Sequence, residues 1–362
     1  MSYLVAIGTA VPEYLHKKEA IMRFFQNSTK DEKTKRKIKI VSEKSGIETR
    51  YSVIPDFSLE PKKFNFFEKT ALLEPEPGLS KRMAIFKKEA LKLSLKAVHA
   101  IPDFKNVQKN ITHIITVTCT GLFAPGLDVE LIKELNLSPS TVRSSVNFMG
   151  CNAAIMAMHS AHTICESNRN ANVLVVCTEL CTIHFRKIYN DDYVLSTSLF
   201  GDGSAAVILS AQKPKEPFFE GIKIDGFHSQ IIHKGASEMA WQLSEKGFIM
   251  NLSSYVSELI SGSLKPLLKS VNIDPKKISL WAVHPGGKKI LDDFAKVLKL
   301  NDSELADSYE TLKNYGNMSS VTVLFVLKRV LENNRMAKKG TKLFSAAFGP
   351  GLSIEAMLLK YV

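Results

Sequence analysis

The chain has 362 residues, of which 45% are hydrophobic and 23% charged, the balance of a soluble globular protein with a substantial core. Its net charge of +12 would suit a nucleic-acid partner, but the sequence contains neither a recognised nucleic-acid module nor an aromatic-basic platform, so we expect none. No apolar run approaches the roughly 20 residues that span a bilayer, and the opening MSYLVAIGTAVP lacks the regions of a signal peptide, so we expect no membrane span.

The cysteines are odd in number and follow no disulfide-scaffold pattern, which favours a reducing, cytoplasmic setting. They are Cys119, Cys151, Cys165, Cys177 and Cys181. None has the spacing of a zinc site, and His159 and His162, one helical turn apart, lack a third ligand nearby. We therefore expect no metal.

The first half of the chain is expected to begin with a strand, followed by charged helices over 13–45 and a proline-rich surface excursion over 52–80. An amphipathic helix follows, then a strand that ends in a glycine turn, a helix after Cys151, an apolar central strand, and a second glycine turn that leads into a strand. Apart from the helix after Cys151, these elements occupy in turn 83–102, 113–121, 171–180 and 198–210.

The second half repeats this order of events. A strand ending in a glycine turn, a glycine followed by small residues and an apolar helix, and Phe-Gly-x-Gly entering a strand occupy 278–287, 315–330 and 346–359. The spacing from Cys119 to Cys151 is 32 residues, and that from His284 to Asn317 is 33. This self-similarity predicts an α/β fold of two halves, 1–215 and 216–362, related by a pseudo-twofold axis.

The repeat brings chemistry-bearing residues together. Cys151 and Asn317 take the same place in their halves, each before an inward-pointing helix, while His284 takes the place of Cys119 at a strand end. A helix N-terminus and an imidazolium can each lower a thiol pKa, and paired His and Asn donors suit a developing oxyanion. A cysteine protease also uses Cys, His and Asn, but two symmetric halves are not expected there.

The motifs in these positions resemble the type III polyketide synthases, the chalcone synthase-like branch of the thiolase superfamily. The resemblance rests on GCNA at Cys151, LVVCTEL, LFGDGSAAVI, AVHPGGKKIL, YGNMSS and the terminal FGPGLSIE, and runs over nearly the whole chain. It implies a thiolase-like αβαβα layered fold and a homodimer. The ketoacyl-(acyl-carrier-protein) synthases III share Cys-His-Asn but typically lack the FGPG ending and the GNMSS form, which makes a single-round condensing enzyme the alternative.

The resemblance also implies a reaction. Cys151 would take an acyl group from an acyl-CoA starter, and His284 with Asn317 would bind malonyl-CoA and stabilise the enolate formed as CO2 leaves. Repeated condensation would end in cyclisation to a pyrone or phenolic product of the alkylpyrone, alkylresorcinol or tetrahydroxynaphthalene kind. Coenzyme A thioesters are substrates in this scheme, and no cofactor is needed. A catalytically silent basic scaffold protein is the rival from another class.

Further residues match cavity positions of the family. Phe200 matches a gatekeeper between the coenzyme A tunnel and the cavity, and Trp241 is our candidate for the second gate aromatic. Where plant enzymes carry threonine or serine, this chain has Cys119, Cys181 and His184, while the remaining matched cavity residues are Glu179, Ser319 and Phe348 of the FGPG motif. The altered hydroxyl pattern points to the bacterial and fungal branch.

Two predictions concern the ends of the substrate path. Lys37 and Lys44 match basic tunnel-mouth positions that hold the coenzyme A phosphates, although Ile40 replaces a third. Ala124 stands where the family inserts a methionine across the dimer interface, and we hypothesise that the small residue leaves extra room for a long acyl chain.

Overall fold

The computed structural model describes residues 1–70, 72–214 and 221–362, and the predicted boundary between the halves at 215/216 falls outside them. Within these residues the largest sheet has nine strands. Their order across the sheet is β11 (Leu280–Val283), β12 (Lys342–Gly349), β13 (Ser353–Tyr361), β8 (Ile222–Ile231), β1 (Ser2–Ala10), β7 (Asp202–Ser210), β6 (Asn172–Leu180), β4 (His113–Thr118) and β5 (Val142–Asn147).

The strand pairings repeat from one half of the sheet to the other. Counted outward from the short β1–β8 contact, β1, β7, β6 and β4 correspond to β8, β13, β12 and β11. The first two pairings in each series are antiparallel and the third is parallel. The pseudo-repeat predicted from glycine turns and spacings is therefore present, with β5 as an additional strand of the first half.

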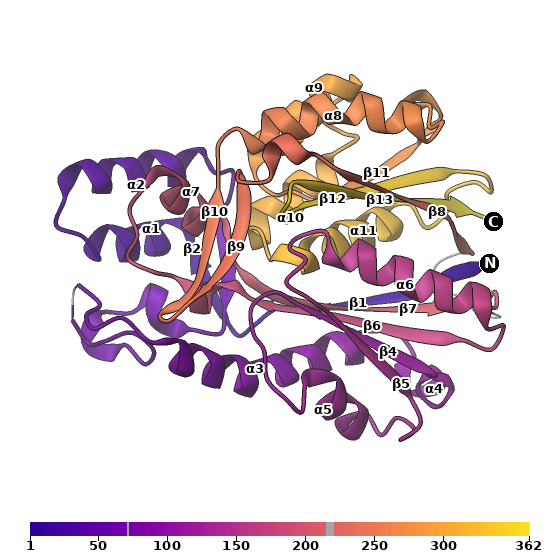
Figure 1. The fold of residues 1–362 in the computed structure, drawn as a ribbon, viewed down its shortest axis with the longest axis horizontal. Helices are drawn as coiled ribbons and strands as arrows, with labels where there is room; N and C mark the ends of the chain where they lie inside the picture. The colour runs from indigo at the N-terminus through magenta and orange to yellow at the C-terminus, as the bar shows by residue number, and fades with distance from the viewer. Residues whose placement is uncertain (71, 215–220) are drawn as a thin grey trace.

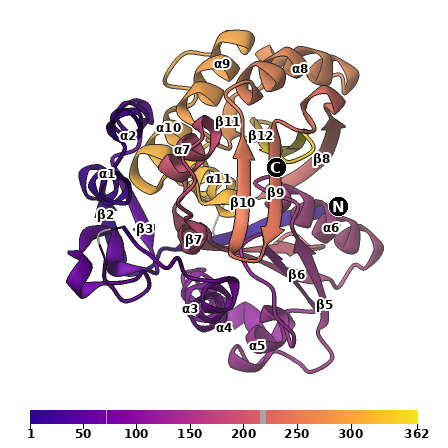
Figure 2. The same cartoon turned by 60° about the vertical axis from the view of Figure 1, so that its left-hand side comes forward.

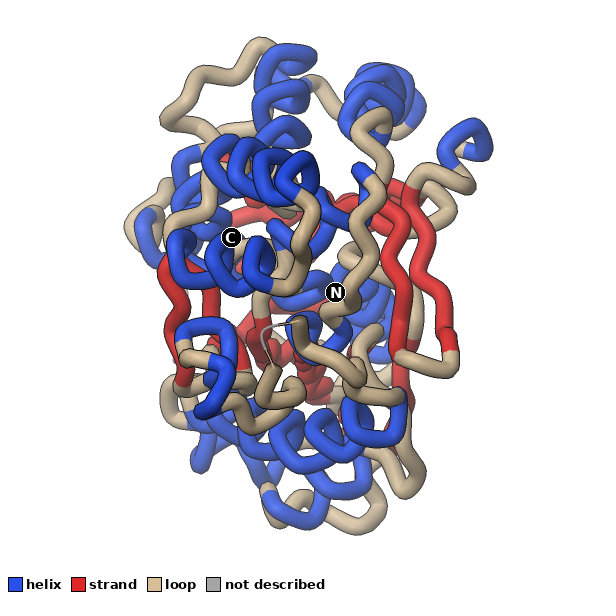
Figure 3. The backbone as a smooth tube through the Cα atoms, turned by 90° about the vertical axis from the view of Figure 1, so that its left-hand side faces the viewer, coloured by secondary structure: helices blue, strands red, loops and turns tan. Residues whose placement is uncertain are grey.

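Helices and strands alternate in five layers, which confirms the αβαβα arrangement (Figure 1). The central layer contains α6 (Ala153–Ser167) and α11 (Thr322–Asn333), between the two halves of the sheet. One outer layer contains α3 (Leu79–His99), α4 (Phe104–Val107) and α5 (Leu127–Glu134), and the other α8 (Val256–Ser270) and α9 (Lys288–Leu298), with α10 (Ala306–Tyr315) at its end. Figure 3 shows these outer helices at the top and bottom of the molecule.

The central helices are packed by small and β-branched residues. Ala153, Ala154, Ala157 and Ala161 of α6 are fully buried in one cluster with valines of α11 and with apolar residues from both halves of the sheet. Because alanine brings a helix close to its neighbours, α6 fits between the sheet layers with its N-terminus at the centre of the molecule.

The charged segment 13–45 is only partly helical. It begins with a short strand, β2 (Tyr14–Lys17), which pairs with β3 (Thr49–Ser52), and continues as α1 (Lys18–Asn27) and α2 (Glu32–Lys44). The helix expected at 83–102 begins earlier and ends sooner, at Leu79–His99. Pairing with β3, which lies outside the segment, explains why a local pattern predicted helix at β2.

The proline-rich segment 52–80 is not simply a surface excursion, and this expectation was wrong. It contains the short helical turns η1 (Pro55–Ser58) and η2 (Pro61–Lys63), and its phenylalanines are buried. The buried Asp56 carboxylate accepts the backbone N–H groups of Asn65, Phe66 and Phe67 at 2.8–2.9 Å, which folds the segment back on itself. Its aromatic rings then form a separate core with α1 and α3.

A two-stranded hairpin, β9 (Met239–Ser244) and β10 (Gly247–Leu252), stands apart from the main sheet. Figure 2 shows it crossing the front of the molecule near α7 (Asp191–Leu199), with which β10 is in contact. None of the helices in the described part of the chain is long and apolar enough to cross a membrane.

Candidate active site

The Gly150–Cys151 turn is shaped by the end of the other half. Gly150 has a φ of +85°, and a Cβ at this position would lie 2.0 Å from Cδ of Pro350 in the terminal FGPG motif. Next to the cysteine, Asn152 Nδ2 donates to Ser353 Oγ at 2.8 Å. A glycine is therefore required before Cys151, both for its backbone conformation and for this close packing.

His284 follows β11, and its backbone N–H donates to Ala346 O at 2.8 Å. Both ring nitrogens of this buried side chain lack a hydrogen-bond partner among the described residues. Asn317 lies between Gly316 and the turn η7 (Ser319–Val321); its Nδ2 donates to Gly286 O at 3.2 Å, and its Oδ1 accepts from the Ser319 N–H at 2.8 Å. The amide is thus held in one orientation, whereas the imidazole has both nitrogens available.

A cavity of about 280 Å³ brings these residues together. Cys151 from the N-terminus of α6, His284 from the end of β11 and Asn317 before η7 all line it, with Phe200 and Phe348. The repeat had predicted this convergence of cysteine, histidine and asparagine.

Burial sets the protonation of the pair. It raises the pKa of the Cys151 thiol to about 12, although hydrogen bonds from the Ser319 and Asn317 side chains act in the opposite direction. Burial also lowers the pKa of the His284 imidazole to about 3. Both shifts favour a neutral thiol and a neutral imidazole near pH 7, and the charge of Glu179 acts on Cys151 in the same direction as burial.

A larger cavity, of about 850 Å³, opens on the other side of Cys151. Phe200 lines it as well, and so do most of the predicted cavity residues, namely Cys119, Cys181, His184, Trp241 and Ser319. Its lining is mainly apolar, as expected of a site that binds a carbon chain.

The two cavities share a wall. Cys151, Phe200, Met239 and Met250 line both of them, whereas Trp241 lines only the larger one. Met250 is the direct cross-strand partner of Trp241 in the hairpin. Met239 and Met250 therefore line the shared wall together with Phe200. Sequence reasoning did not single out Met250 because it is not aromatic, although the alternation along β10 places it on the same face as the cavity residue Phe248.

Trp241 belongs to an aromatic block at the floor of the larger cavity. Its Nε1 donates to Cys119 O at 2.7 Å, and its ring meets those of His184 and Phe248 edge to face. His184 stacks on Phe248 with centroids 4.2 Å apart, and its Nε2 lies 2.7 Å from Thr120 O. Burial lowers the pKa of His184 to about 3, so the block carries no charge at neutral pH.

Glu179 lies behind the cavity wall. Its Oε2 accepts the Cys119 N–H at 2.9 Å and the Thr120 hydroxyl at 2.8 Å, and its Oε1 accepts the Ser320 hydroxyl at 2.6 Å. Burial raises its pKa, and the side chain does not line either cavity. The predicted cavity residue therefore acts as a tie between β4, β6 and η7.

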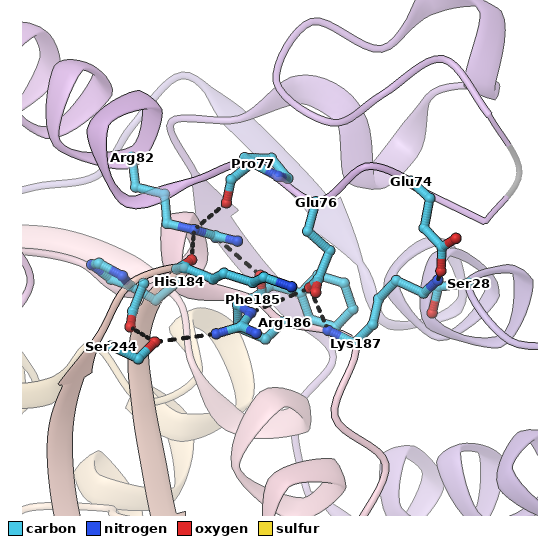
Figure 4. A network of polar contacts seen from close by, with 12 residues as sticks. Ser28, Glu74, Glu76, Pro77, Arg82, His184, Phe185, Arg186, Lys187 and Ser244 are labelled. Carbon is cyan, nitrogen blue, oxygen red and sulfur yellow. Dashed lines mark hydrogen bonds and ion pairs between the residues drawn. The ribbon is translucent and has the colours of Figure 1, made fainter.

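Arg82 fixes another part of the wall, the segment after β6 (Figure 4). This fully buried guanidinium donates from Nη1 to Ile183 O and Phe185 O, and from Nε to Lys246 O at 2.8 Å in the β9–β10 turn. Glu76 adds a second link, because it accepts the Lys187 N–H at 2.8 Å and pairs with Arg186. Together these contacts hold the hairpin and Phe185 in place.

The predicted coenzyme A lysines lie outside both cavities. Lys37 forms an ion pair with Asp191 at the start of α7, and Lys44 is exposed in the last turn of α2. The structure thus places them on one helix face, and an incoming phosphate would have to compete with Asp191 for Lys37.

Family models match both parts of the chain. The N-terminal domain of the chalcone and stilbene synthases matches residues 1–213, and the C-terminal domain of the same family matches residues 224–362. A curated relative, the alpha-pyrone synthesis polyketide synthase-like Pks18 of Mycobacterium tuberculosis, is 31% identical over 331 residues, which cover 89% of this chain and 81% of that protein.

Solved structures agree with this match. The polyketide synthase PKS-I of the brown alga Ectocarpus siliculosus has a TM-score of 0.91 at 26% identity, covering 100% of this chain and 99% of that one. The 1,3,6,8-tetrahydroxynaphthalene synthase of Streptomyces coelicolor A3(2), a bacterial type III enzyme, has a TM-score of 0.86 at 25% identity, covering 99% of each chain.

Proposed function

The chain belongs to the chalcone and stilbene synthase family and is a type III polyketide synthase, an acyltransferase that performs decarboxylative condensation, and on this premise we propose the residues that carry each step. The observation that carries the assignment is the cavity shared by Cys151, His284 and Asn317, in which the imidazole has two unpartnered nitrogens.

Acyl transfer comes first. His284 accepts the proton of the neutral Cys151 thiol as the sulfur attacks the thioester carbonyl of the starter. The departing coenzyme A thiolate then takes this proton back, which leaves the acyl group on Cys151 and the imidazole neutral. An unpartnered, uncharged imidazole is suited to this transfer because it has a free lone pair.

Condensation follows on malonyl-CoA. The N–H of His284 and the second hydrogen of Asn317 Nδ2 donate to the thioester oxygen, which becomes negatively charged as CO2 leaves. The resulting enolate attacks the acyl carbonyl on Cys151, a carbon–carbon bond forms and the Cys151 sulfur departs. Because the loss of CO2 drives the reaction, we propose that no cofactor takes part and that coenzyme A thioesters are the substrates.

We propose a different role for each of the two cavities. We assign the smaller one to the thioester and the larger one to the growing chain, with Phe200 and Met250 at the wall between them. Cyclisation to a pyrone or a phenolic product would take place in the larger cavity, as the names of the Pks18 and tetrahydroxynaphthalene synthase relatives suggest for those proteins. The comparisons lend no support to the alternative, a single-round ketoacyl synthase.

The remaining assignments concern the surroundings of the enzyme. We propose that Lys37 and Lys44 hold the coenzyme A phosphates at the tunnel mouth. We also propose a homodimer, because β5 lies at the edge of the sheet with its outer edge unpaired in the described chain, and five of its six residues are exposed. A cytoplasmic setting agrees with the free state of all five cysteines in the described chain.

The test is product analysis. The protein is incubated with malonyl-CoA and a panel of short, aromatic and long acyl-CoA starters, and the products are identified by mass spectrometry while CO2 release is measured. Cyclised products carrying several malonyl-derived units are expected, and the Cys151→Ala variant should form none. If neither CO2 nor condensation products arise from any starter, the proposed function is wrong.

Single substitutions test His284 and Asn317 one at a time. We expect His284→Ala and Asn317→Ala to lower kcat for condensation about 10²- to 10³-fold, because each removes a donor to the developing oxyanion. Asn333→Ala, an exposed residue of α11, serves as the control and should retain wild-type turnover.

A further inference from the structure

The larger cavity extends away from Cys151 toward α1 and the turn η1. Its far lining consists of Ile21 and Phe25 of α1, Phe57 of η1 and Phe185. All four side chains are buried. This part of the cavity therefore presents hydrocarbon surface and suits an aliphatic chain better than a polar polyketide.

A second pocket, of about 550 Å³, lies on the other side of η1, between α1 and η2. Phe24, Phe64 and Leu59 line it together with the polar residues Arg23, Asn27 and Glu60. Phe57 lines both this outer pocket and the larger cavity. Its ring therefore forms part of the boundary between the larger cavity and this second pocket, which we call the outer pocket.

Phe57 is held by edge-to-face contacts, with ring centroids 4.8 Å from Phe24, 5.6 Å from His16 and 5.9 Å from Phe67. The neighbouring Asp56 accepts three backbone N–H groups and anchors the turn that carries it. The ring is consequently a fixed surface, not a loose side chain at the end of a channel.

Among the described residues, Phe57 is the one that lines both the larger cavity and the outer pocket. The aromatic block of Trp241, His184 and Phe248 closes the floor of the larger cavity, and none of its three residues lines the outer pocket. Ala124 is exposed and does not line the larger cavity of its own subunit in the described chain. The extra room that we hypothesise at Ala124 lies across the dimer interface and is separate from the apolar extension at α1 and η1.

We propose that the far part of the larger cavity binds the tail of a linear aliphatic acyl-CoA starter, and that Phe57 is the end wall that determines the longest tail accepted. The inference rests on the proposed function, since the tail belongs to the starter on Cys151. Each buried methylene adds roughly fourfold to binding, so affinity rises with length until the terminal methyl meets the Phe57 ring. Longer tails then clash, because the interior is close-packed.

The test measures kcat/KM for saturated acyl-CoA starters from butanoyl-CoA to icosanoyl-CoA in the wild type and in Phe57→Ala and Phe57→Trp. The wild-type profile should rise and then fall. Phe57→Ala opens the boundary to the outer pocket, so kcat/KM begins to decline only at longer chain lengths. For the first starter that the wild type rejects, we expect kcat/KM to gain about tenfold. Phe57→Trp moves the fall to shorter chains.

Phe64→Ala is the matched control. Phe64 is buried and lines the outer pocket but not the larger cavity, so its loss weakens the same aromatic core without moving the end wall. Its chain-length profile should keep the wild-type maximum. If Phe57→Ala does not fold, as judged by thermal unfolding, Phe57→Leu makes a smaller opening and should shift the profile in the same direction.

The two proposals fail in different ways. If the wild type releases no CO2 and extends no starter, the proposed function fails. If it extends starters but the Phe57 variants that fold keep the wild-type profile, or if Phe64→Ala shifts it equally, then Phe57 is not the end wall and the present inference is overturned.

Discussion

Phe200 and Asn317 are joined by an isolated parallel bridge between the two halves of the molecule. The Asn317 N–H donates to Leu199 O and the Gly201 N–H donates to Asn317 O, both at 2.9 Å. The wall residue of one half and the amide of the other therefore share a short backbone link. A shift of either residue moves both the cavity wall and the proposed oxyanion donor.

Gly316 is required by this link. Its φ is +67°, and a Cβ there would lie 2.7 Å from Leu199 O and 2.9 Å from Arg50 Cδ. We expect Gly316→Ala to lower the free energy of unfolding by about 2 kcal/mol or more and to reduce kcat, because the left-handed backbone alone costs about 1–2 kcal/mol.

Urea unfolding checks this prediction. The control is Gly340→Ala, since Gly340 also has a positive φ, of +94°, but an added Cβ would meet nothing within 4 Å. Gly340→Ala should show the backbone cost alone and leave turnover unchanged. Equal losses in the two variants would contradict a role for the contacts with Leu199 and Arg50.

Arg50 holds Phe200 from the opposite side. This buried guanidinium donates from Nη1 to Thr197 O at 2.9 Å and to Phe200 O at 3.0 Å. Burial lowers its pKa to about 9, against the favourable charge of Asp202. We expect Arg50→Met to cost at least about 2 kcal/mol, since it leaves both carbonyls without this donor, and to raise KM for malonyl-CoA as Phe200 moves.

Unfolding and steady-state kinetics together test the role of Arg50. Arg50→Lys should restore part of the effect on KM, because an ammonium group can reach one carbonyl. Lys133→Met, which removes one partner of the exposed Lys133–Glu134 pair, is the control and should change stability little. An unchanged KM in Arg50→Met would show that the side chain only supports the fold.

The sequence predicts the centre of this molecule better than its periphery. The correspondence of Cys151 with Asn317 follows from the repeat, because both glycine turns serve equivalent helices between equivalent strands. Met250 could not be found in the same way, since it lies on the β9–β10 hairpin and shares its cavity with residues of other segments, among them Phe200 and His284. Its role depends on the packing of a hairpin whose position the repeat does not predict.

The buried phenylalanines of 52–80 show a second limit. Four prolines gave the segment the appearance of a surface loop, and what buries it is the Asp56 carboxylate, which accepts three backbone N–H groups from residues nine to eleven positions further on. Glu179 shows the same effect at the site, because its partners lie 59 to 141 positions away. Long-range hydrogen bonds of this kind leave no local pattern.

The neutral His184 predicts a pH dependence. Its pKa is about 3 in the fold against 6.5 in the unfolded chain, so between these values only the unfolded chain binds the proton. The stabilisation is complete above pH 6.5 and is lost as the pH falls. The stability of the wild type relative to His184→Gln should drop by about 2 kcal/mol between pH 6.5 and about pH 5.

Urea unfolding at the two pH values measures this difference. His233→Gln, at an exposed position in the described chain, provides the comparison for a histidine that faces solvent. A wild-type stability that runs parallel to that of His184→Gln across this range would mean that His184 binds its proton in the folded protein.

Glu179 distinguishes a structural tie from a residue that acts on substrate. Every partner donates to it: Oε2 accepts from the Cys119 N–H and the Thr118 and Thr120 hydroxyls, and Oε1 accepts from the Ser320 hydroxyl. In Glu179→Gln the amide oxygen can take the place of Oε2, and the NH2 can donate to Ser320, whose hydroxyl rotates to accept. We therefore expect Glu179→Gln to lower the free energy of unfolding by less than about 1 kcal/mol and to retain most of the condensation activity. Glu179→Ala leaves the buried Cys119 N–H unpaired, so it should lower the free energy of unfolding by about 1–3 kcal/mol or more. Urea unfolding and product formation are measured on both variants. Loss of condensation in a stable Glu179→Gln protein would mean that the carboxylate itself takes part in the reaction.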